Sequence, residues 1–440
     1  MKTALRLLTG ALALAIASSG FAGASAASST TPTINDSAVG IIQGGGASFP
    51  NDQYQKWITD IATYNVGFGS NSGSSLVLTY TKSSSGTGKS NFYGANARKA
   101  SQMFSGTDSL LTSAQRASAA GIAGGYTVVP MTAGPLSVIT NLPGISVNIK
   151  LNAEVLCGIY AGDITSWNNA KILALNPTVK ALKTYNHTIV PVARDATSGT
   201  TFIFVSFLAT GATAAQHKCG YTTDWADTAT SFSSLTGTIS PADAVMSTRF
   251  SAMRAAKTPA ADAIQSKTGN DGIRNYVSAT SYSVGYVEMA YSFARNVKTA
   301  AIATASKYTS GANKGKPNYL LPSVAGATNA LEAQNKRYPG AAINPSASYL
   351  QPVNQAGLST YPIVGYSWML LYRNYDTTIT DAPSLGQVQG LVYFLNWSLT
   401  TGSVYTAGGV KCYAPLPTSV KNLVIAQLKT ITADGGTVWQ

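Results

Sequence analysis

One short segment of this 440-residue chain has the composition of an anion-binding loop: serine, glycine and threonine stand directly before an apolar run. Ser198, Gly199 and Thr200 precede the apolar run from Phe202 to Leu208, which we expect to be helical. The first N–H groups of a helix lack partners within the helix, and its dipole favours negative charge there. Hydroxyls and exposed amides in this position are suited to binding an oxyanion.

Arg194 lies four residues before Ser198, and its planar guanidinium can contact two oxygens of one anion. A single loop of this kind is more often an ordinary helix cap than a ligand site. Two further loops, 46–50 and 83–88, have the same composition, and Asp108 stands in a third segment, 104–110. Together these loops predict an anion site.

Strands and helices alternate around these loops. A strand at 40–42, a turn at 44–50, a helix carrying Tyr54, Trp57, Ile58 and Ile61, and a strand at 76–80 follow one another. The same order returns with a strand at 187–192 and the helix at 201–208. Alternation of this kind predicts an α/β protein with mostly parallel sheets, in which ligands bind beyond the carboxyl ends of the strands. Residues 361–371 are expected to form a strand, 420–428 a helix, and 307–352 an elaborated loop region.

The N-terminus has the pattern of a secretory signal. Lys2 and Arg6 precede an apolar run, and Ala24-Ser25-Ala26 fits a cleavage site, so we expect residues 1–26 to be removed. The apolar run is shorter than the ~20 residues that span a bilayer. The remaining chain is long enough for two domains.

Charge and reactive side chains narrow the function further. The net charge of +13 favours an anionic partner. The chain has no block of consecutive Lys or Arg, which argues against a nucleic-acid-binding arm. Cys157, Cys219 and Cys412 allow either one disulfide with a free thiol or buried, inert thiols. His187 and His217 are the only histidines, so a metal cluster or a Ser/His catalytic pair has little material. We expect no metal, no cofactor and no catalytic residues.

The chain resembles the periplasmic phosphate-binding proteins of bacterial ABC importers over nearly all of its mature length. The motifs that carry ligand residues in that family are similar to 46–50, 83–86, 104–110 and 194–201 here. Further matches, which carry no ligand contacts, are 162–168, 175–177, 269–273, 285–288 and 413–417.

The resemblance implies a class II periplasmic-binding-protein fold, with two α/β lobes and a ligand cleft between them. Residues 40–131 and 360–440 would form lobe I, and 132–359 lobe II. The protein would be a periplasmic or secreted monomer that is not an enzyme, binds inorganic phosphate and delivers it to ABC permease subunits in the inner membrane. The implied phosphate ligands are Ser48, the Phe49 amide, Ser84, Asp108, Arg194, Ser198, Gly199 and Thr200.

Asp108 would affect which anions can bind, and Asp195 would affect how Arg194 is held in place. Asp108 would accept the proton that phosphate still carries near neutral pH, and sulfate brings no such proton. The family pattern reads Arg-x-Asp-Gly-Ser-Gly-Thr, whereas Asp195 here directly follows Arg194. Because the acid is shifted by one residue, the sequence does not decide which group holds the Arg194 guanidinium in place.

Three other functions remain as alternatives. The protein could be a receptor for another tetrahedral oxyanion, which would have no use for the acceptor Asp108. A secreted phosphatase would need metal ligands or an activated nucleophile, for which the chain offers no material. A secreted or surface interaction protein not coupled to transport would use the basic charge and the 307–352 segment.

Overall fold

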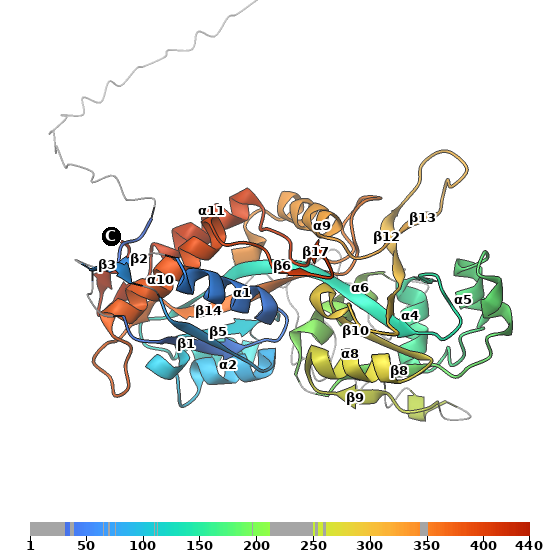
Figure 1. Cartoon of the computed structure of the whole chain (residues 1–440), viewed down its shortest axis with the longest axis horizontal. Helices are drawn as coiled ribbons and strands as arrows, with labels where there is room; N and C mark the ends of the chain where they lie inside the picture. The colour runs from blue at the N-terminus through green and yellow to red at the C-terminus, as the bar shows by residue number, and fades with distance from the viewer. Residues whose placement is uncertain are drawn as a thin grey trace, which may run out of the picture.

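The computed structural model describes residues 31–35, 39–64, 66–68, 71–74, 76–109, 111, 113–195, 197–211, 250, 254–257, 261–343 and 351–440. Two α/β bodies lie side by side in it (Figure 1), as the sequence predicts. The expected signal segment 1–26 and Cys219 lie outside the described residues.

One long strand, β6 (Tyr126–Asn141), takes part in both bodies. Its first part pairs with β14 (Val364–Tyr372), where Val364 lies opposite Pro135. Its last part pairs with β10 (Ser283–Glu288), where Glu288 lies opposite Leu136. The two lobes are therefore halves of one sheet, with strand order β4-β1-β5-β14-β6-β10-β8-β9.

The first lobe surrounds β4, β1, β5 and β14. β1 pairs in parallel with β4 and β5, while β14 runs antiparallel to β5. In α1, Tyr54, Trp57 and Ile61 are buried, as their helical spacing predicts, whereas Ile58 is only partly buried. The elements are β1 (Ile42–Gly46), α1 (Asn51–Ala62), β2 (Val66–Phe68), β3 (Asn71–Ser74), β4 (Leu78–Lys82), α2 (Ser85–Tyr93), β5 (Phe104–Thr107), α3 (Ser113–Ala120), β14, β15 (Asn374–Tyr375), α10 (Leu385–Thr400), β16 (Thr406–Ala407), β17 (Val410–Lys411), α11 (Thr418–Leu428), β18 (Thr432–Ala433) and β19 (Gly436–Thr437).

The second lobe surrounds β10, β8 and β9, which are parallel to one another. The apolar helix α6 packs on this sheet, where Phe204 stacks on Tyr286 with ring centroids 4.4 Å apart. The elements are β7 (Lys150–Leu151), α4 (Ala153–Ala161), α5 (Ala170–Leu175), β8 (Val190–Arg194), α6 (Gly199–Gly211), β9 (Gln265–Lys267), α8 (Gly269–Ala279), β10, β11 (Lys298–Thr299), β12 (Ala301–Lys307) and β13 (Pro317–Leu320).

Two segments, expected from the sequence to be a turn and a loop, belong to a strand and a helix. Gly44 to Gly46 belong to strand β1, where they pair with β4 and β5, rather than to a turn. Glycine is needed at position 44 because a Cβ there would lie 2.5 Å from the ring of Phe104 on β5. Residues 85–88 form the first turn of α2 rather than a loop. The anion loops are therefore shorter than the sequence suggests, and the helix ends lie closer to the strands.

The prediction of a loop region at 307–352 is wrong for most of this segment. It contains strand β13, paired with β12, and the 14-residue helix α9 (Val324–Arg337), which Ser323 caps by accepting a hydrogen bond from the Gly326 N–H. Helix α9 packs against β6 and β14. Its buried face is made mainly of small residues and Leu331, so the hydrophobic pattern is weak.

The two cysteines within the described residues differ in oxidation state. Cys157 is disulfide-bonded, whereas Cys412 is free and buried. None of the helices in the described ranges combines the length and hydrophobicity that a bilayer span requires.

Candidate anion-binding site

Four strands end at the place where the lobes meet. Ser48 follows β1, Asp108 follows β5, Arg194 ends β8, and Glu288 ends β10. Each of these side chains is at most 4% exposed. Because all four strands point their carboxyl ends toward this place, one buried cluster contains residues from both lobes.

Arg194 reaches from the second lobe to the first. Its Nη1 donates to the Ser48 hydroxyl at 3.3 Å, and the same hydroxyl accepts from Asn270 Nδ2 at 2.9 Å. Arg194 Nε and Asn270 Oδ1 are buried without a hydrogen-bond partner. Such atoms are rare in folded proteins and indicate a place where a polar ligand fits.

Asp108 is held on both carboxylate oxygens. Ser367 donates to Oδ1 at 2.6 Å, and Ser85 donates to Oδ2 at 3.3 Å. Burial raises the pKa of Asp108 well above its usual value, and the Glu288 carboxylate raises it too, against the lowering effects of Ser367, Arg194 and Ser85. Asp108 is therefore suited to share a proton with a partner.

The N-termini of α2 and α6 face each other across the lobes. Ser85, the first residue of α2, accepts hydrogen bonds from the N–H groups of Asp108 at 3.1 Å and Gly199 at 3.2 Å. Gly199 is the first residue of α6, and a Cβ there would lie 2.4 Å from Asp108 Cβ. Only glycine permits this approach. Two helix dipoles thus present their positive ends to the cluster.

The other predicted ligands lie nearby, but several hydroxyls are already engaged. Ser84 caps α2 by accepting from the Thr87 N–H at 3.1 Å, and Ser198 caps α6 by accepting from the Thr201 N–H at 3.3 Å. Phe49 is fully buried, and its carbonyl accepts from the Tyr413 hydroxyl at 2.8 Å.

Thr200 connects the start of α6 to Glu288. Its hydroxyl donates to Glu288 Oε1 at 2.6 Å, whereas Oε2 is buried without a partner. Burial raises the pKa of Glu288 to about 7, although the Thr200 hydrogen bond, the nearby Arg194 charge and the Asn270 amide lower it.

Asp195 points away from this cluster. It is exposed, and its carboxylate accepts a hydrogen bond from the Thr268 hydroxyl. Its backbone N–H donates to the Lys267 carbonyl at 3.2 Å. Asp195 and Arg194, both within the described ranges, form no ion pair, so the shifted acid does not anchor the arginine.

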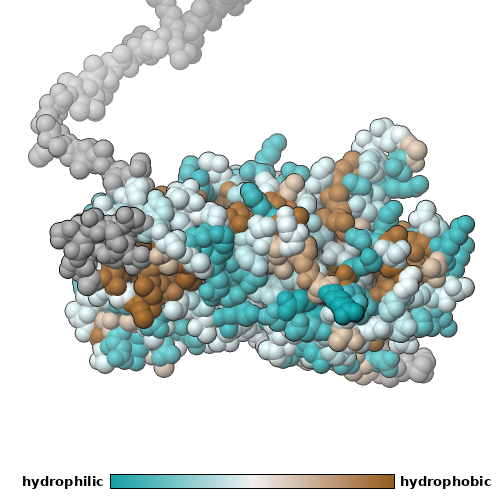
Figure 2. All heavy atoms as spheres, viewed as in Figure 1, coloured by the Kyte–Doolittle hydropathy of each residue, from teal (hydrophilic) through white to brown (hydrophobic). Residues whose placement is uncertain are grey.

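Polar contacts also join the lobes at the edge of the cluster. Lys82 of the first lobe forms an ion pair with Asp271 of the second at 2.6 Å, and Tyr291 donates to Asp52 at 3.1 Å. Teal, polar residues lie in the lower part of the middle of the face in Figure 2, with white and tan residues above them. Contacts between the lobes thus enclose this edge of the cluster.

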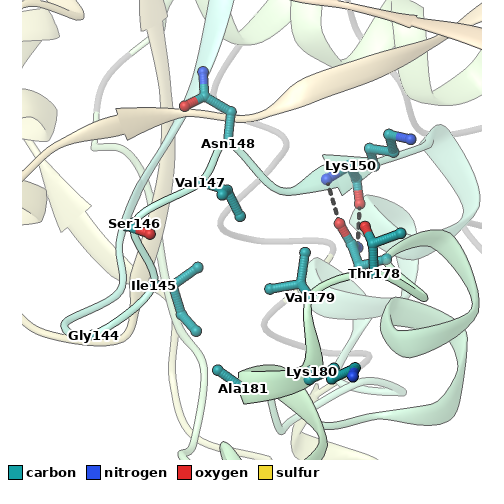
Figure 3. A pocket seen from close by; sticks show the side chains of 11 residues that line it. Gly144, Ile145, Ser146, Val147, Asn148, Lys150, Thr178, Val179, Lys180 and Ala181 are labelled. Carbon is teal, nitrogen blue, oxygen red and sulfur yellow. Dashed lines mark hydrogen bonds between the residues drawn. The ribbon is translucent and has the colours of Figure 1, made fainter.

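A separate pocket of about 310 Å³ lies in the second lobe, between segments 144–150 and 176–181. The apolar side chains of Ile145, Val147 and Val179 project toward its interior (Figure 3). Asn176 fixes its wall by exchanging two hydrogen bonds with the Lys150 backbone, at 2.7 and 2.9 Å. None of the predicted ligand residues lines this pocket, and in the part of the chain that the structure describes no group of acidic, His and Cys side chains forms a metal site.

Sequence reasoning missed four residues of the cluster: Ser85, Asn270, Glu288 and Ser367. Asn270 and Glu288 stand in the matching segments 269–273 and 285–288, to which no ligand contact was assigned. Ser85 is adjacent to the predicted Ser84, and a one-residue change in the helix start decides which hydroxyl faces the cluster. Ser367 sits within an apolar strand, where its polar side chain was the available signal.

The arrangement suits a small oxyanion that carries a proton. Arg194, two helix N-termini and several hydroxyls supply positive charge and donors, while Asp108 supplies an acceptor beside them.

Comparisons with known proteins agree with this geometry. The phosphate-binding protein PstS of Pasteurella multocida is 27% identical over 314 residues, covering 71% of this chain and 73% of the relative. The PstS of Methanocaldococcus jannaschii is 25% identical over 369 residues, covering 82% and 79%.

Solved structures share the fold. A phosphate-binding protein from Stenotrophomonas maltophilia aligns with a TM-score of 0.55 and 20% identity over 88% of this chain and 93% of its own. A periplasmic phosphate-binding protein solved with phosphate at pH 8.5 gives 0.56 at the same identity and coverage. The family model described as the PBP superfamily domain matches residues 27–400. Because that match spans most of the chain, the protein belongs to the PBP superfamily.

Proposed function

We propose that this protein binds inorganic phosphate between its lobes and delivers it to an ABC-type permease for uptake. The observation that carries phosphate binding is the buried cluster in which Arg194 and Asp108, from opposite lobes, lie beside the N-termini of α2 and α6. Transport is supported by the relatives named PstS, whose match covers most of this chain.

The proposed ligands are Ser48, the Phe49 amide, Ser84, Asp108, Arg194, Ser198, Gly199 and Thr200. Ser85 and Asn270 join them because each touches this set directly: Ser85 bonds Asp108 and Gly199, and Asn270 bonds Ser48. No residue of the set acts as a nucleophile in this proposal, so the protein binds phosphate without hydrolysing esters.

Asp108 would distinguish phosphate from sulfate by the proton that the pair shares. Phosphate near neutral pH brings that proton with it. Sulfate brings none, so Asp108 itself must be protonated to face it, and this becomes less favourable as pH rises. Because burial already raises the pKa of Asp108, discrimination should be stronger at pH 8 than at pH 6.

The test is calorimetric titration of the ligand-stripped protein with phosphate and, separately, sulfate, for the wild type and Asp108→Asn. We expect one phosphate per chain and no sulfate binding at pH 8 in the wild type. The amide of Asp108→Asn can donate to either anion, so this variant should bind sulfate and lose selectivity by roughly tenfold or more.

Asp195→Asn is the matched control, because Asp195 is an exposed acid beside Arg194 that bonds Thr268. It should keep wild-type selectivity. If the wild type binds neither anion, the proposal fails, and a surface interaction protein becomes the better account. Equal binding of phosphate and sulfate by the wild type would instead indicate a general oxyanion receptor.

The remaining features belong to the same proposal. Residues 1–26 direct export and are removed, and the mature monomer works in the periplasm without nucleic acid or cofactor. Residues 40–131 with 360–440 form lobe I, and 132–359 form lobe II. The sharing of β6 between β14 and β10 supports a division within that strand.

A further inference from the structure

Glu288 is the one buried carboxyl of the described cluster that the proposed phosphate contacts leave without a role. It ends β10, next to β8, which carries Arg194. Its side chain is 1% exposed, so a charge on it is poorly hydrated. An acid in such a position needs either a fixed positive partner or a proton.

The two oxygens of Glu288 have different surroundings. Oε1 accepts from the Thr200 hydroxyl at 2.6 Å, whereas Oε2 is buried and has no hydrogen-bond partner of normal geometry: the nearby Asn270 amide, which lowers the pKa of Glu288, donates to Ser48 instead. An ionised carboxylate with one bare oxygen in the interior is costly, but the same oxygen can carry a proton. The geometry thus marks Oε2 as the place for that proton.

The charges around the cluster give the direction of the effect. Glu288 faces Arg194 on β8, Asp108 after β5, Asn270 on α8, Thr200 on α6, Tyr291 after β10 and Tyr413 near the C-terminus. With Asp195 turned outward, Arg194 is the one cation among these groups. Two ionised carboxylates would already outweigh it before an anion arrives.

We infer that Glu288 takes up a proton from solvent onto Oε2 when phosphate binds, so that affinity for phosphate falls as pH rises through neutrality. The bound anion takes over Arg194 as its partner and adds negative charge nearby, and both effects disfavour the ionised acid. Glu288 is a positioning residue here: it holds Thr200 and acts on the ligand through its charge. This inference rests on the proposed phosphate binding.

The pKa of Glu288, which burial raises to about 7, places the change in a measurable range. Below that pH the acid is already neutral, and binding requires no proton at this site. Above it, each bound phosphate should draw up to about one extra proton, and affinity should fall by up to roughly tenfold per pH unit relative to a variant without the acid.

The experiment is calorimetric titration with inorganic phosphate at pH 6, 7, 8 and 9, in pairs of buffers with different ionisation enthalpies, for wild type and Glu288→Gln. The buffer difference gives the number of protons taken up. Ionisation of phosphate itself is common to both proteins and cancels in the comparison. The glutamine side chain of Glu288→Gln is isosteric with glutamate and can still accept from Thr200, so the comparison removes the charge of Glu288 together with its effect on the pKa of Asp108.

We expect the wild type to take up close to one proton more than Glu288→Gln at pH 8, with no difference at pH 6. Asp195→Asn should match the wild type at every pH. Equal proton numbers and parallel pH profiles for wild type and Glu288→Gln would overturn the inference while leaving phosphate binding intact. Absence of binding by the wild type would instead contradict the proposed function.

Glu288→Asp guards against a glutamine variant that does not fold. It keeps a titratable acid but withdraws it by one methylene from Thr200, so the midpoint of the pH profile should move while the proton uptake remains. An unchanged midpoint in Glu288→Asp would also count against Glu288.

Discussion

The two sides of the cluster differ in how completely their polar groups are satisfied. On the first lobe, Asp108 is bonded on both oxygens, by Ser367 and Ser85. Beside it on the same lobe, the Tyr54 hydroxyl is buried without a hydrogen-bond partner, whereas the second lobe's side of the cluster has three such atoms: Arg194 Nε, Asn270 Oδ1 and Glu288 Oε2. Unpaired buried groups cost about 1–3 kcal/mol each, so the second lobe carries most of the polar demand that a ligand can meet.

This contrast suggests a division of labour between the lobes. In the proposed function, the fixed acceptor of the first lobe would decide which anions are allowed. The cation and donors of the second lobe, which gain most from an anion, would decide how tightly it is held. If the proposed function holds, hinge closure would bring the two sides together around the anion.

The largest effect should come from Arg194→Met. It removes the buried cation of the second lobe, and losing a buried, hydrogen-bonded charge costs about 2–5 kcal/mol, roughly thirty- to several-thousand-fold in affinity for phosphate. Arg274→Met is the matched control, because Arg274 is partly exposed and pairs with Asp271 on its own helix. It should change affinity less than about fivefold. Similar losses in both variants would mean that general basic charge, rather than the cluster, attracts the anion.

An intermediate effect should come from Gly199→Ala, which acts where the two sides touch. Its Cβ would lie 2.5 Å from Ser85 Oγ and 2.8 Å from Asp108 Cα, so the lobes must separate locally. We expect a loss of about 1–3 kcal/mol, roughly five- to hundredfold in phosphate affinity.

The control for that change is Gly272→Ala in α8, where the nearest atom to the new Cβ, Lys267 Cβ, is 3.4 Å away. Alanine there should leave affinity unchanged and stabilise the helix by about 0.5–1 kcal/mol, measured as a small rise in melting temperature. If Gly199→Ala binds phosphate as tightly as Gly272→Ala, the close approach of α6 to Asp108 is not needed for binding.

The smallest effect should come from the first lobe, in Ser85→Ala. The hydroxyl accepts from two N–H groups and donates to Asp108, but at 3.1 to 3.3 Å these bonds are long. We expect a loss of about 1 kcal/mol, roughly fivefold in affinity. Ser84→Ala should lower the melting temperature through loss of the α2 cap and weaken phosphate binding less than Ser85→Ala does, because the Ser84 hydroxyl is already bonded to the Thr87 N–H. The reverse order would make Ser84 the stronger ligand of the two and would weaken the contrast between the lobes.

The sequence predicted the α/β class and the residues whose chemistry is plain from their type. Arg194 and Gly199 could be singled out because a cation and a glycine before a helix suit an anion, and Asp108 because of the resemblance to the phosphate-binding proteins. Ser84 and Ser85 could not be told apart, because the choice depends on whether α2 begins at one residue or the next, and helix ends are uncertain by that amount.

Features that depend on packing were harder to predict. The role of β6 in both lobes could not be foreseen, since its buried run of residues reads the same whichever strand pairs with it. Helix α9 was not predicted, because the small residues on its buried face give a weak hydrophobic pattern. Glu288 looked like part of a matching segment, and only its burial beside Arg194 gives it chemical meaning.

The most direct test of the account is a crystal structure of the protein with arsenate, a tetrahedral anion that carries a proton as phosphate does and whose arsenic atom is located by anomalous scattering. We predict one strong anomalous peak within hydrogen-bonding reach of Arg194, Asp108 and Ser48, between the starts of α2 and α6. A peak elsewhere, or none at a saturating arsenate concentration, would contradict the claim that the anion binds in this cluster.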